Sequence, residues 1–238
     1  MSRNLLIVST STVYGQEYLS YCEEAIKAFF AGKKEIIFIP YARPGGITHE
    51  EYTARAKDKF NQLGFEVKGL HEFTNPKEAL KTAEGVFTGG GNTFVLLNQL
   101  YENDLVEVIR ERVADGMPYM GTSAGSNITG LTISTTNDMP IVYPPSFDAL
   151  QLVPFNLNPH YLDPQPDSKH MGETRETRIG EFHHFNTQPV VGLREGSWLH
   201  VQGDQVSLEG PLSARIFEKG KVPYELSPED DFSFLLQL

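Results

Sequence analysis

The sequence contains a single cysteine, Cys22, so it cannot form a disulfide within the chain. Cys22 lies in an apolar pattern with helical spacing, which favours a buried small side chain over a nucleophile. Long apolar runs are missing too, since none approaches the roughly 20 residues that cross a membrane. The first residues, Met1 to Leu5, lead directly into an expected strand and lack the features of a signal peptide. These absences predict a cytoplasmic protein that does not bind membranes.

Basic residues are also scarce, with 20 lysines and arginines against 31 aspartates and glutamates. The formal net charge at pH 7 is −11. Without a basic surface to offset the charge of phosphates, nucleic acid is not expected as a partner. An acidic small-molecule substrate would need a local basic pocket. The sequence leaves both a monomer and a homodimer open.

Apolar runs and helical patterns alternate through the first half of the chain. Leu5–Ser9 and Ile36–Ile39 are continuous apolar runs, which are typical of strands buried on both faces. The helical pattern at 48–63 begins with Thr48 and Glu51, a capping-box pair. Further helices are expected at 17–31, 76–83, 93–101 and 104–114, and further strands at 65–70, 86–88 and 119–121. Repeated β-α-β units predict an α/β fold with a doubly wound, mostly parallel sheet and helices on both faces.

The second half of the chain has a different pattern. Residues 132–165 are rich in proline, asparagine and threonine, whereas Arg175–Phe185 has the length of one helix. Short strands separated by turns are expected at 190–193, 197–201, 205–208 and 214–217. We expect them to form a C-terminal β-hairpin extension that completes the same sheet. The chain is thus expected to be a single domain spanning residues 1–238.

Two loops of small residues follow strands of the expected sheet. Ser123 lies in the run Gly121-Thr122-Ser123-Ala124-Gly125, where a sharp strand-to-helix turn would expose its hydroxyl. The run Gly89-Gly90-Gly91-Asn92 follows the preceding strand, and ligands gather where parallel strands end. Such a glycine loop also serves tight packing or phosphate binding, but the P-loop and dinucleotide patterns are missing. The two loops together predict a site with a serine nucleophile.

A serine nucleophile needs a base, which at neutral pH is usually a histidine that a carboxylate orients. Of the seven histidines, His160 is favoured because it lies in an irregular segment directly after a proline. Asp138 lies between the serine and the histidine, the order found in parallel-sheet hydrolases. Glu195 lies in a tight turn. Either carboxylate taken singly is more often a solvated loop residue, so the pattern leaves the choice open.

Four motifs together resemble dipeptidase E, the family of cytoplasmic α-aspartyl dipeptidases. They are 89–93, 121–126, 158–161 and 172–175, and they occur in the family's order along nearly the whole chain. The family is related to cyanophycinase and, more distantly, to the class I glutamine amidotransferases. The resemblance implies an amidotransferase-like fold and a serine peptidase. It also implies cleavage of dipeptides with an N-terminal aspartate, with no metal and no cofactor.

The resemblance also implies roles for individual residues. Ser123 is the nucleophile, His160 is the base, and Asp138 is slightly preferred to Glu195 as the acid. The oxyanion hole would use backbone N–H groups. They are those of Ala124 and of Gly90 or Gly91.

An aspartyl substrate carries a side-chain carboxylate, which arginine binds best through two parallel hydrogen bonds. Arg175 is the first candidate and Arg178 the second, with Lys169 and His170 nearby in the sequence. Glu173 would hold the ammonium group of the substrate. The two arginines can instead form the exposed face of a helix.

Three other functions stay open. A related amidohydrolase would use the same triad on β-aspartyl links such as those of cyanophycin. A metal hydrolase would use His160, Asp163, His170 and His183 or His184, although the His-Glu-x-x-His motif is missing. A catalytically silent small-molecule-binding module is the third alternative, but a serine, a histidine and two candidate acids are all present.

Overall fold

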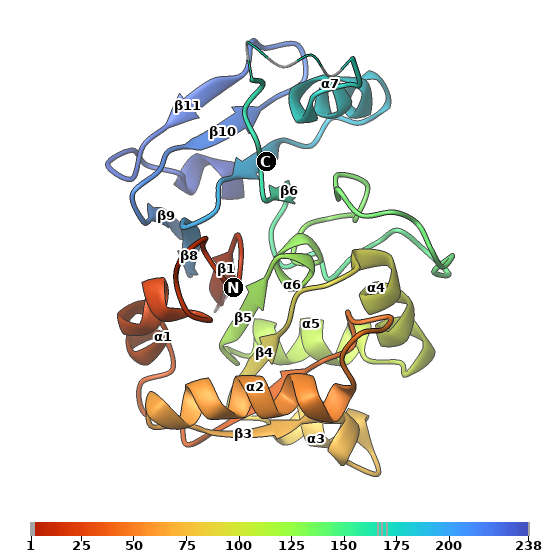
Figure 1. Ribbon diagram of the computed structural model, residues 1–238, viewed down its shortest axis with the longest axis vertical. Helices are drawn as coiled ribbons and strands as arrows, with labels where there is room; N and C mark the ends of the chain where they lie inside the picture. Colours follow the sequence, from red (N-terminus) through yellow and green to blue (C-terminus); the bar gives the residue numbers. More distant parts are fainter. Residues whose placement is uncertain (1–2, 166, 168, 170, 238) are drawn as a thin grey trace.

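In the computed structural model, which describes residues 3–165, 167, 169 and 171–237, the larger of two sheets has seven strands (Figure 1). Their order is β3-β2-β4-β5-β1-β8-β9, and the first five run parallel. The strands β8 and β9 form an antiparallel hairpin at one edge. Their bounds are β1 Asn4–Val8, β2 Glu35–Ile39, β3 Glu66–Gly69, β4 Val86–Thr88, β5 Tyr119–Thr122, β8 Trp198–Gln202 and β9 Gln205–Glu209. The expected doubly wound, mostly parallel sheet is confirmed.

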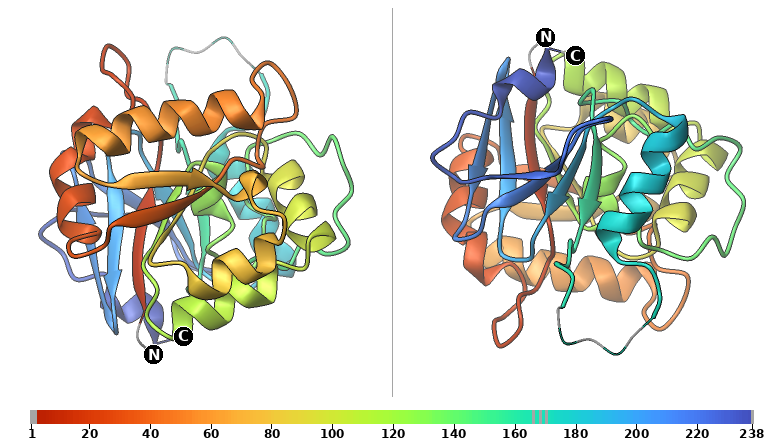
Figure 2. Two further views of the ribbon diagram at one scale, coloured as in Figure 1. Left: turned by 90° about the horizontal axis from the view of Figure 1, so that it is seen from below. Right: turned by 90° about the horizontal axis from the view of Figure 1, so that it is seen from above.

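Helices cover both faces of this sheet (Figure 2). Leu6 and Val8 pack with α1 and α2 on one face, while Leu5 and Ile7 pack with α3, α4 and α5 on the other. This alternation is why the strands read as continuous apolar runs, since both faces are buried. The helices are α1 Glu23–Phe29, α2 His49–Gln62, α3 Pro76–Thr82, α4 Thr93–Glu102, α5 Val106–Ala114 and α6 Ala124–Asn127. Short 3₁₀ turns lie at η1 Ser20–Cys22, η2 Leu70–Glu72 and η3 Ser233–Leu236.

The start of α2 shows the capping box that the sequence predicts. Thr48 Oγ1 accepts a hydrogen bond from the Glu51 N–H at 3.2 Å, and Glu51 Oε2 accepts from the Thr48 N–H at 2.8 Å. The long helix expected at 17–31 is shorter than predicted, because Leu19 has a φ of 57° and only η1 and α1 follow it.

A second sheet of four strands packs beside the first, with α7 against it (Figure 1). Its order is β11-β10-β7-β6, with β6 and β7 parallel and the other pairs antiparallel. The bounds are β6 Asn156–Pro159, α7 Arg175–Phe185, β7 Val190–Leu193, β10 Ala214–Phe217 and β11 Tyr224–Leu226. The expectation that all four late strands complete one sheet is therefore wrong for β7 and β10. Only β8 and β9 extend the larger sheet.

The strand β6 explains this difference. Its sequence is Asn-Leu-Asn-Pro, and both asparagines are buried. Asn156 donates to Thr132 Oγ1, and Asn158 donates to the Thr135 carbonyl and to Asn137 Oδ1. These hydrogen bonds offset the cost of burying amides, so a buried strand forms where hydropathy indicates a loop.

Two pairs of parallel strands set the place of the site. β4 and β5 are neighbours in the larger sheet, so the loops after them lie together. β6 and β7 are neighbours in the smaller sheet, so the residues after Pro159 and Leu193 also lie together. The described part of the chain contains no helix with the length and apolar character needed to span a membrane.

Candidate active site

Ser123 lies at a strained turn between β5 and α6. Its φ is 53° and its ψ −111°, a backbone conformation that costs a non-glycine residue roughly 1–3 kcal/mol. The Ser123 N–H donates to the Val8 carbonyl at 3.1 Å, and its own carbonyl accepts from the Ser126 and Asn127 N–H groups. These bonds hold the turn in place. They leave the hydroxyl of Ser123 at the wall of a pocket of 310 Å³.

His160 connects Ser123 to Glu195. Its Nε2 lies 2.9 Å from Ser123 Oγ, and its Nδ1 lies 2.5 Å from Glu195 Oε1. An ionised carboxylate only accepts hydrogen bonds, so Nδ1 carries the proton and Nε2 is free to accept from the serine hydroxyl. In this arrangement the imidazole can take the proton of the serine hydroxyl while the carboxylate orients the ring.

The backbone of His160 is held in place by a buried serine. His160 has a φ of 54°, and its N–H donates to Ser9 Oγ at 3.0 Å. Ser9 Oγ in turn donates to the Leu193 carbonyl at 2.7 Å. Ser9 follows β1, so the first strand of the larger sheet ties the ends of β6 and β7 together.

The structure corrects the sequence-based preference for Asp138 as the partner of His160. Asp138 Oδ2 accepts from the Thr93 N–H at 2.7 Å, from Thr93 Oγ1 at 2.6 Å and from Thr136 Oγ1 at 3.1 Å. Glu195 occupies the place beside the histidine, because the parallel pairing of β6 with β7 brings it there. Chain order alone carries no information about this pairing.

The loop Gly89-Gly90-Gly91 lies directly against Ser123. A Cβ at Gly90 would be 2.9 Å from Ser123 Cβ, and one at Gly91 would be 2.2 Å from the Ala42 carbonyl oxygen. Gly91 also has a φ of +149°, which side chains rarely tolerate. Tyr52, on α2, donates its hydroxyl to the Gly90 carbonyl at 3.1 Å. The loop therefore has to be glycine, and α2 fixes its orientation.

The close approach of Gly90 gives a first prediction. We expect Gly90→Ala to impair any reaction at Ser123 by at least about 10-fold in kcat, because the new methyl group displaces the serine or the loop. The matched control is Gly180→Ala in α7, where a Cβ meets no atom within 4 Å. That change should raise stability by about 0.5–1 kcal/mol and leave kcat unchanged. Steady-state kinetics and thermal unfolding of both variants test this, and equal kcat in the two would contradict it.

Charged groups of both signs line the pocket at Ser123. Arg175, at the start of α7, and Asp138 both belong to its wall, together with Thr93, Asn127 and Asn137. Partial burial lowers the pKa of Arg175, as does the neighbouring Arg178, while Asp138 opposes the shift. No carboxylate of the described residues lies within ion-pairing distance of Arg175. The guanidinium is thus available to an anionic ligand.

The other two predicted binding residues lie further out. Glu173 and Arg178 are exposed and line a neighbouring hollow that shares Asn137 and Arg175 with the pocket. The structure therefore brings Arg175 to Ser123 but places Glu173 and Arg178 beyond it. Lys169 is not part of either lining, and His170 lies outside the described residues.

Three of the residues considered for metal binding, His160, Asp163 and His183, have other partners. Asp163 forms an ion pair with Arg194, and His183 Nε2 lies 3.0 Å from the Gln188 carbonyl. Within the described residues, no three His, Cys, Asp or Glu side chains cluster closely enough to hold a metal ion. Cys22 is buried, and burial raises the pKa of its thiol to about 12.

Sequence reasoning missed several residues of the site. Thr93, Thr136 and Asn137 line the pocket, and the first two hold Asp138. Thr93 comes directly after the run Gly89-Gly90-Gly91-Asn92, so its position in the sequence could have indicated that it lies at the site. Thr136 and Asn137 lie in an irregular segment, where no pattern distinguishes them from ordinary loop residues.

The chain is similar to known proteins in sequence and in fold. The sequence profile of peptidase family S51 matches residues 5–209. A "Probable alpha-aspartyl dipeptidase" of Drosophila melanogaster is 47% identical over 239 residues, which cover 99% of this chain and 98% of that protein. Peptidase E of Streptomyces coelicolor is 48% identical over 235 residues, with 99% and 96% covered. The fold is similar to the crystal structure of a peptidase from an acI-B1 Actinobacterium, with a TM-score of 0.74, 21% identity and 98% of both chains covered.

Proposed function

This chain belongs to peptidase family S51, and we propose that it is a serine dipeptidase that hydrolyses dipeptides with an N-terminal aspartate. The observation that carries the proposal is the hydrogen-bonded series from Ser123 through His160 to Glu195. The pocket beside it contains one arginine and one carboxylate, which match the two charges of an N-terminal aspartyl residue. The names of two full-length relatives support the same activity.

The proposed reaction begins with attack of Ser123 Oγ on the carbonyl carbon of the Asp–Xaa bond. His160 Nε2 takes the hydroxyl proton, and Glu195 stabilises the imidazolium through Nδ1–H. His160 then protonates the leaving amine, which leaves an aspartyl ester on Ser123. A water molecule, activated by His160, hydrolyses this ester and restores the free enzyme.

The tetrahedral intermediate needs donors for its oxyanion. We assign this role to the backbone N–H of Ala124, directly after the nucleophile, and to that of Gly90 or Gly91. The approach of Gly90 to Ser123 supports the second assignment. The loss of one such donor typically lowers kcat by about 100- to 1000-fold.

The charges of the pocket suggest how the aspartyl residue is held. We assign the substrate's side-chain carboxylate to Arg175 and its ammonium group to Asp138. The hydrogen bonds that Asp138 accepts from described residues all end on Oδ2, so Oδ1 is available to a ligand. Glu173, the residue first considered for the ammonium group, is exposed in the neighbouring hollow and fits less well.

The site takes residues from both sheets. Ser123 and the glycine loop follow strands of the larger sheet, whereas His160 and Glu195 follow strands of the smaller one. Neither sheet forms the site without the other, so we propose that the chain acts as a single domain. The proposed reaction uses no metal or cofactor.

A panel of substrates tests the proposed function. We expect rapid cleavage of Asp-Leu and little or no cleavage of Glu-Leu, Asn-Leu and Ala-Leu, measured as release of free leucine. Faster cleavage of β-Asp-Arg than of Asp-Leu would instead indicate the related β-aspartyl amidohydrolase. Binding of aspartate without cleavage of any peptide would indicate a silent binding module.

Arg175 gives a prediction about this specificity. We expect Arg175→Met to lower kcat/KM for Asp-Leu by roughly 10- to 200-fold, because it removes hydrogen bonds to a charged group worth about 1.5–3 kcal/mol. The matched control is Arg178→Met, which removes the exposed arginine three residues away and should cost much less. Equal effects of the two substitutions would contradict the assignment of the carboxylate to Arg175.

A further inference from the structure

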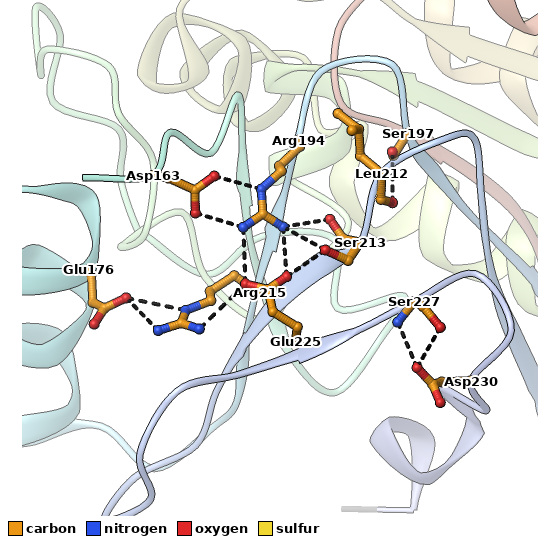
Figure 3. A network of polar contacts seen from close by, with 10 residues as sticks. All are labelled: Asp163, Glu176, Arg194, Ser197, Leu212, Ser213, Arg215, Glu225, Ser227 and Asp230. Carbon is orange, nitrogen blue, oxygen red and sulfur yellow. Dashed lines mark hydrogen bonds and ion pairs between the residues drawn. The ribbon is translucent and has the colours of Figure 1, made fainter. Parts of the chain in front are cut away.

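Arg194, directly before Glu195, uses all five N–H groups of its guanidinium (Figure 3). Nε and Nη2 donate to the two carboxylate oxygens of Asp163 at 2.9 and 2.6 Å. Nη1 and Nη2 donate to those of Glu225 at 2.8 and 3.0 Å, and Nη1 also donates to the Ser213 carbonyl at 2.7 Å. The side chain is only 15% exposed. Each nitrogen of this guanidinium thus has an acceptor among the described residues, which fixes the side chain in one orientation.

Arg194 connects the segment that carries the proposed base with the segment that carries the proposed acid. Asp163 lies three residues after His160, and the Arg194 guanidinium lies 5.5 Å from the centre of the Tyr161 ring. The Tyr161 N–H donates to the Leu193 carbonyl at 3.1 Å. Residues 160–163 and 193–195 are thus joined by an ion pair, a cation–π contact and a backbone hydrogen bond. Glu225, on β11, anchors this pair of segments to the smaller sheet.

The charges of this network are stable at neutral pH. The hydrogen bonds from Arg194 are the main reason why the pKa of Asp163 is lowered. Burial alone would raise the pKa of Glu225, but hydrogen bonds from Arg194 and Ser213 outweigh it and lower the pKa. Both carboxylates are therefore ionised at neutral pH and accept charged hydrogen bonds from the guanidinium.

The proposed base and acid need such support, because burial does not fix them. The side chain of His160 is 34% exposed and that of Glu195 is 46% exposed. Each is therefore partly open to water, and the contact between His160 and Glu195 depends on where the backbone places them. Misplacement of reacting groups by about 1 Å can cost about 100-fold in rate.

We propose that Arg194 is a positioning residue that sets the relative placement of His160 and Glu195 and thereby the rate of the chemical step. This proposal rests on the proposed function. It assigns to Arg194 no contact with the substrate, so its effect belongs in kcat and not in KM. Lysine would not replace it, since a single ammonium group cannot bind two carboxylates with parallel pairs of hydrogen bonds.

The test compares Arg194→Lys with Arg110→Lys. Arg110, on α5, is a matched control because its Nε donates to the Leu150 carbonyl at 3.0 Å, its Nη2 donates to the Ala149 carbonyl, and it pairs with Glu107. Both changes should lower the melting temperature. Only Arg194→Lys should lower kcat for Asp-Leu, by about 10- to 100-fold, with KM changed less than about 3-fold. Unchanged kcat in Arg194→Lys, or equal losses of kcat in both variants, would overturn the proposal.

A double-mutant cycle shows whether Arg194 acts through Glu195. In the Glu195→Gln background, Arg194→Lys should change kcat less than about 3-fold, since the contact that it positions is already lost. An undiminished effect in that background would overturn the proposal. The proposed function fails separately, and visibly, if the unmodified enzyme does not cleave Asp-Leu or if Glu195→Gln retains its full kcat.

Discussion

Ser123→Ala is expected to lower kcat for Asp-Leu by roughly 10⁴- to 10⁶-fold. Without the hydroxyl there is no group to form the aspartyl ester, and only binding and the oxyanion donors remain to accelerate the reaction. The decrease in kcat is measured as the rate of leucine release, which is monitored by chromatography in the presence of a chelator. A variant that keeps more than a few per cent of the parental kcat would exclude Ser123 as the nucleophile.

Binding and stability measurements show that the loss in Ser123→Ala is chemical. Arg175 and Asp138, which we assign to the substrate's charges, are unchanged in this variant. Calorimetry should therefore give a Kd for Asp-Leu close to the KM of the parent protein. Among the described residues, the Ser123 hydroxyl has a hydrogen-bond partner only in His160, so the melting temperature should change little. A variant that neither binds nor folds would leave the comparison to His160→Ala, for which the same loss of kcat is expected.

Glu195→Gln is expected to lower kcat by roughly 10³- to 10⁴-fold with little change in KM. The glutamine amide can turn its NH₂ group toward His160 Nδ1, which then has to accept, and the proton moves to Nε2. In that tautomer the histidine cannot take the proton of Ser123. The neutral side chain also gives no stabilisation to the imidazolium that forms during the reaction.

Asp138→Asn is the matched comparison for Glu195→Gln, because each replaces one carboxylate of the site by its amide. Asp138 accepts hydrogen bonds from Thr93 and Thr136, and asparagine keeps an acceptor for them. We therefore expect Asp138→Asn to raise KM, through a weaker hold on the substrate's ammonium group, and to leave kcat within about 10-fold. If Asp138→Asn instead removes kcat and Glu195→Gln does not, the order of the triad acids is reversed.

The larger sheet could be predicted from the sequence because its strands are buried on both faces. Leu5 to Val8 and Ile36 to Ile39 have no polar side chain, and each is followed by a helix that ends in glycine or a turn. The serine turn and the glycine loop were found for the same reason, since their small residues follow such strands. The strand Asn156–Pro159 was missed, because its asparagines are buried through hydrogen bonds that no hydropathy pattern contains.

The choice between Asp138 and Glu195 could not be predicted from the order of residues along the chain. Which carboxylate meets His160 depends on the parallel pairing of β6 with β7, and that pairing joins residues more than thirty positions apart. The same holds for Arg194, an ordinary charge in the sequence that becomes fully hydrogen-bonded only when Asp163, Ser213 and Glu225 converge on it. Local patterns follow from each residue's own hydrophobicity and backbone freedom, so the fold class, the serine turn and the proposed nucleophile could be predicted from the sequence. The proposed orienting acid and the arginine network depend on strand pairing within the smaller sheet, which joins distant segments of the chain. The proposed binding carboxylate, Asp138, is held by Thr93, which follows a strand of the larger sheet.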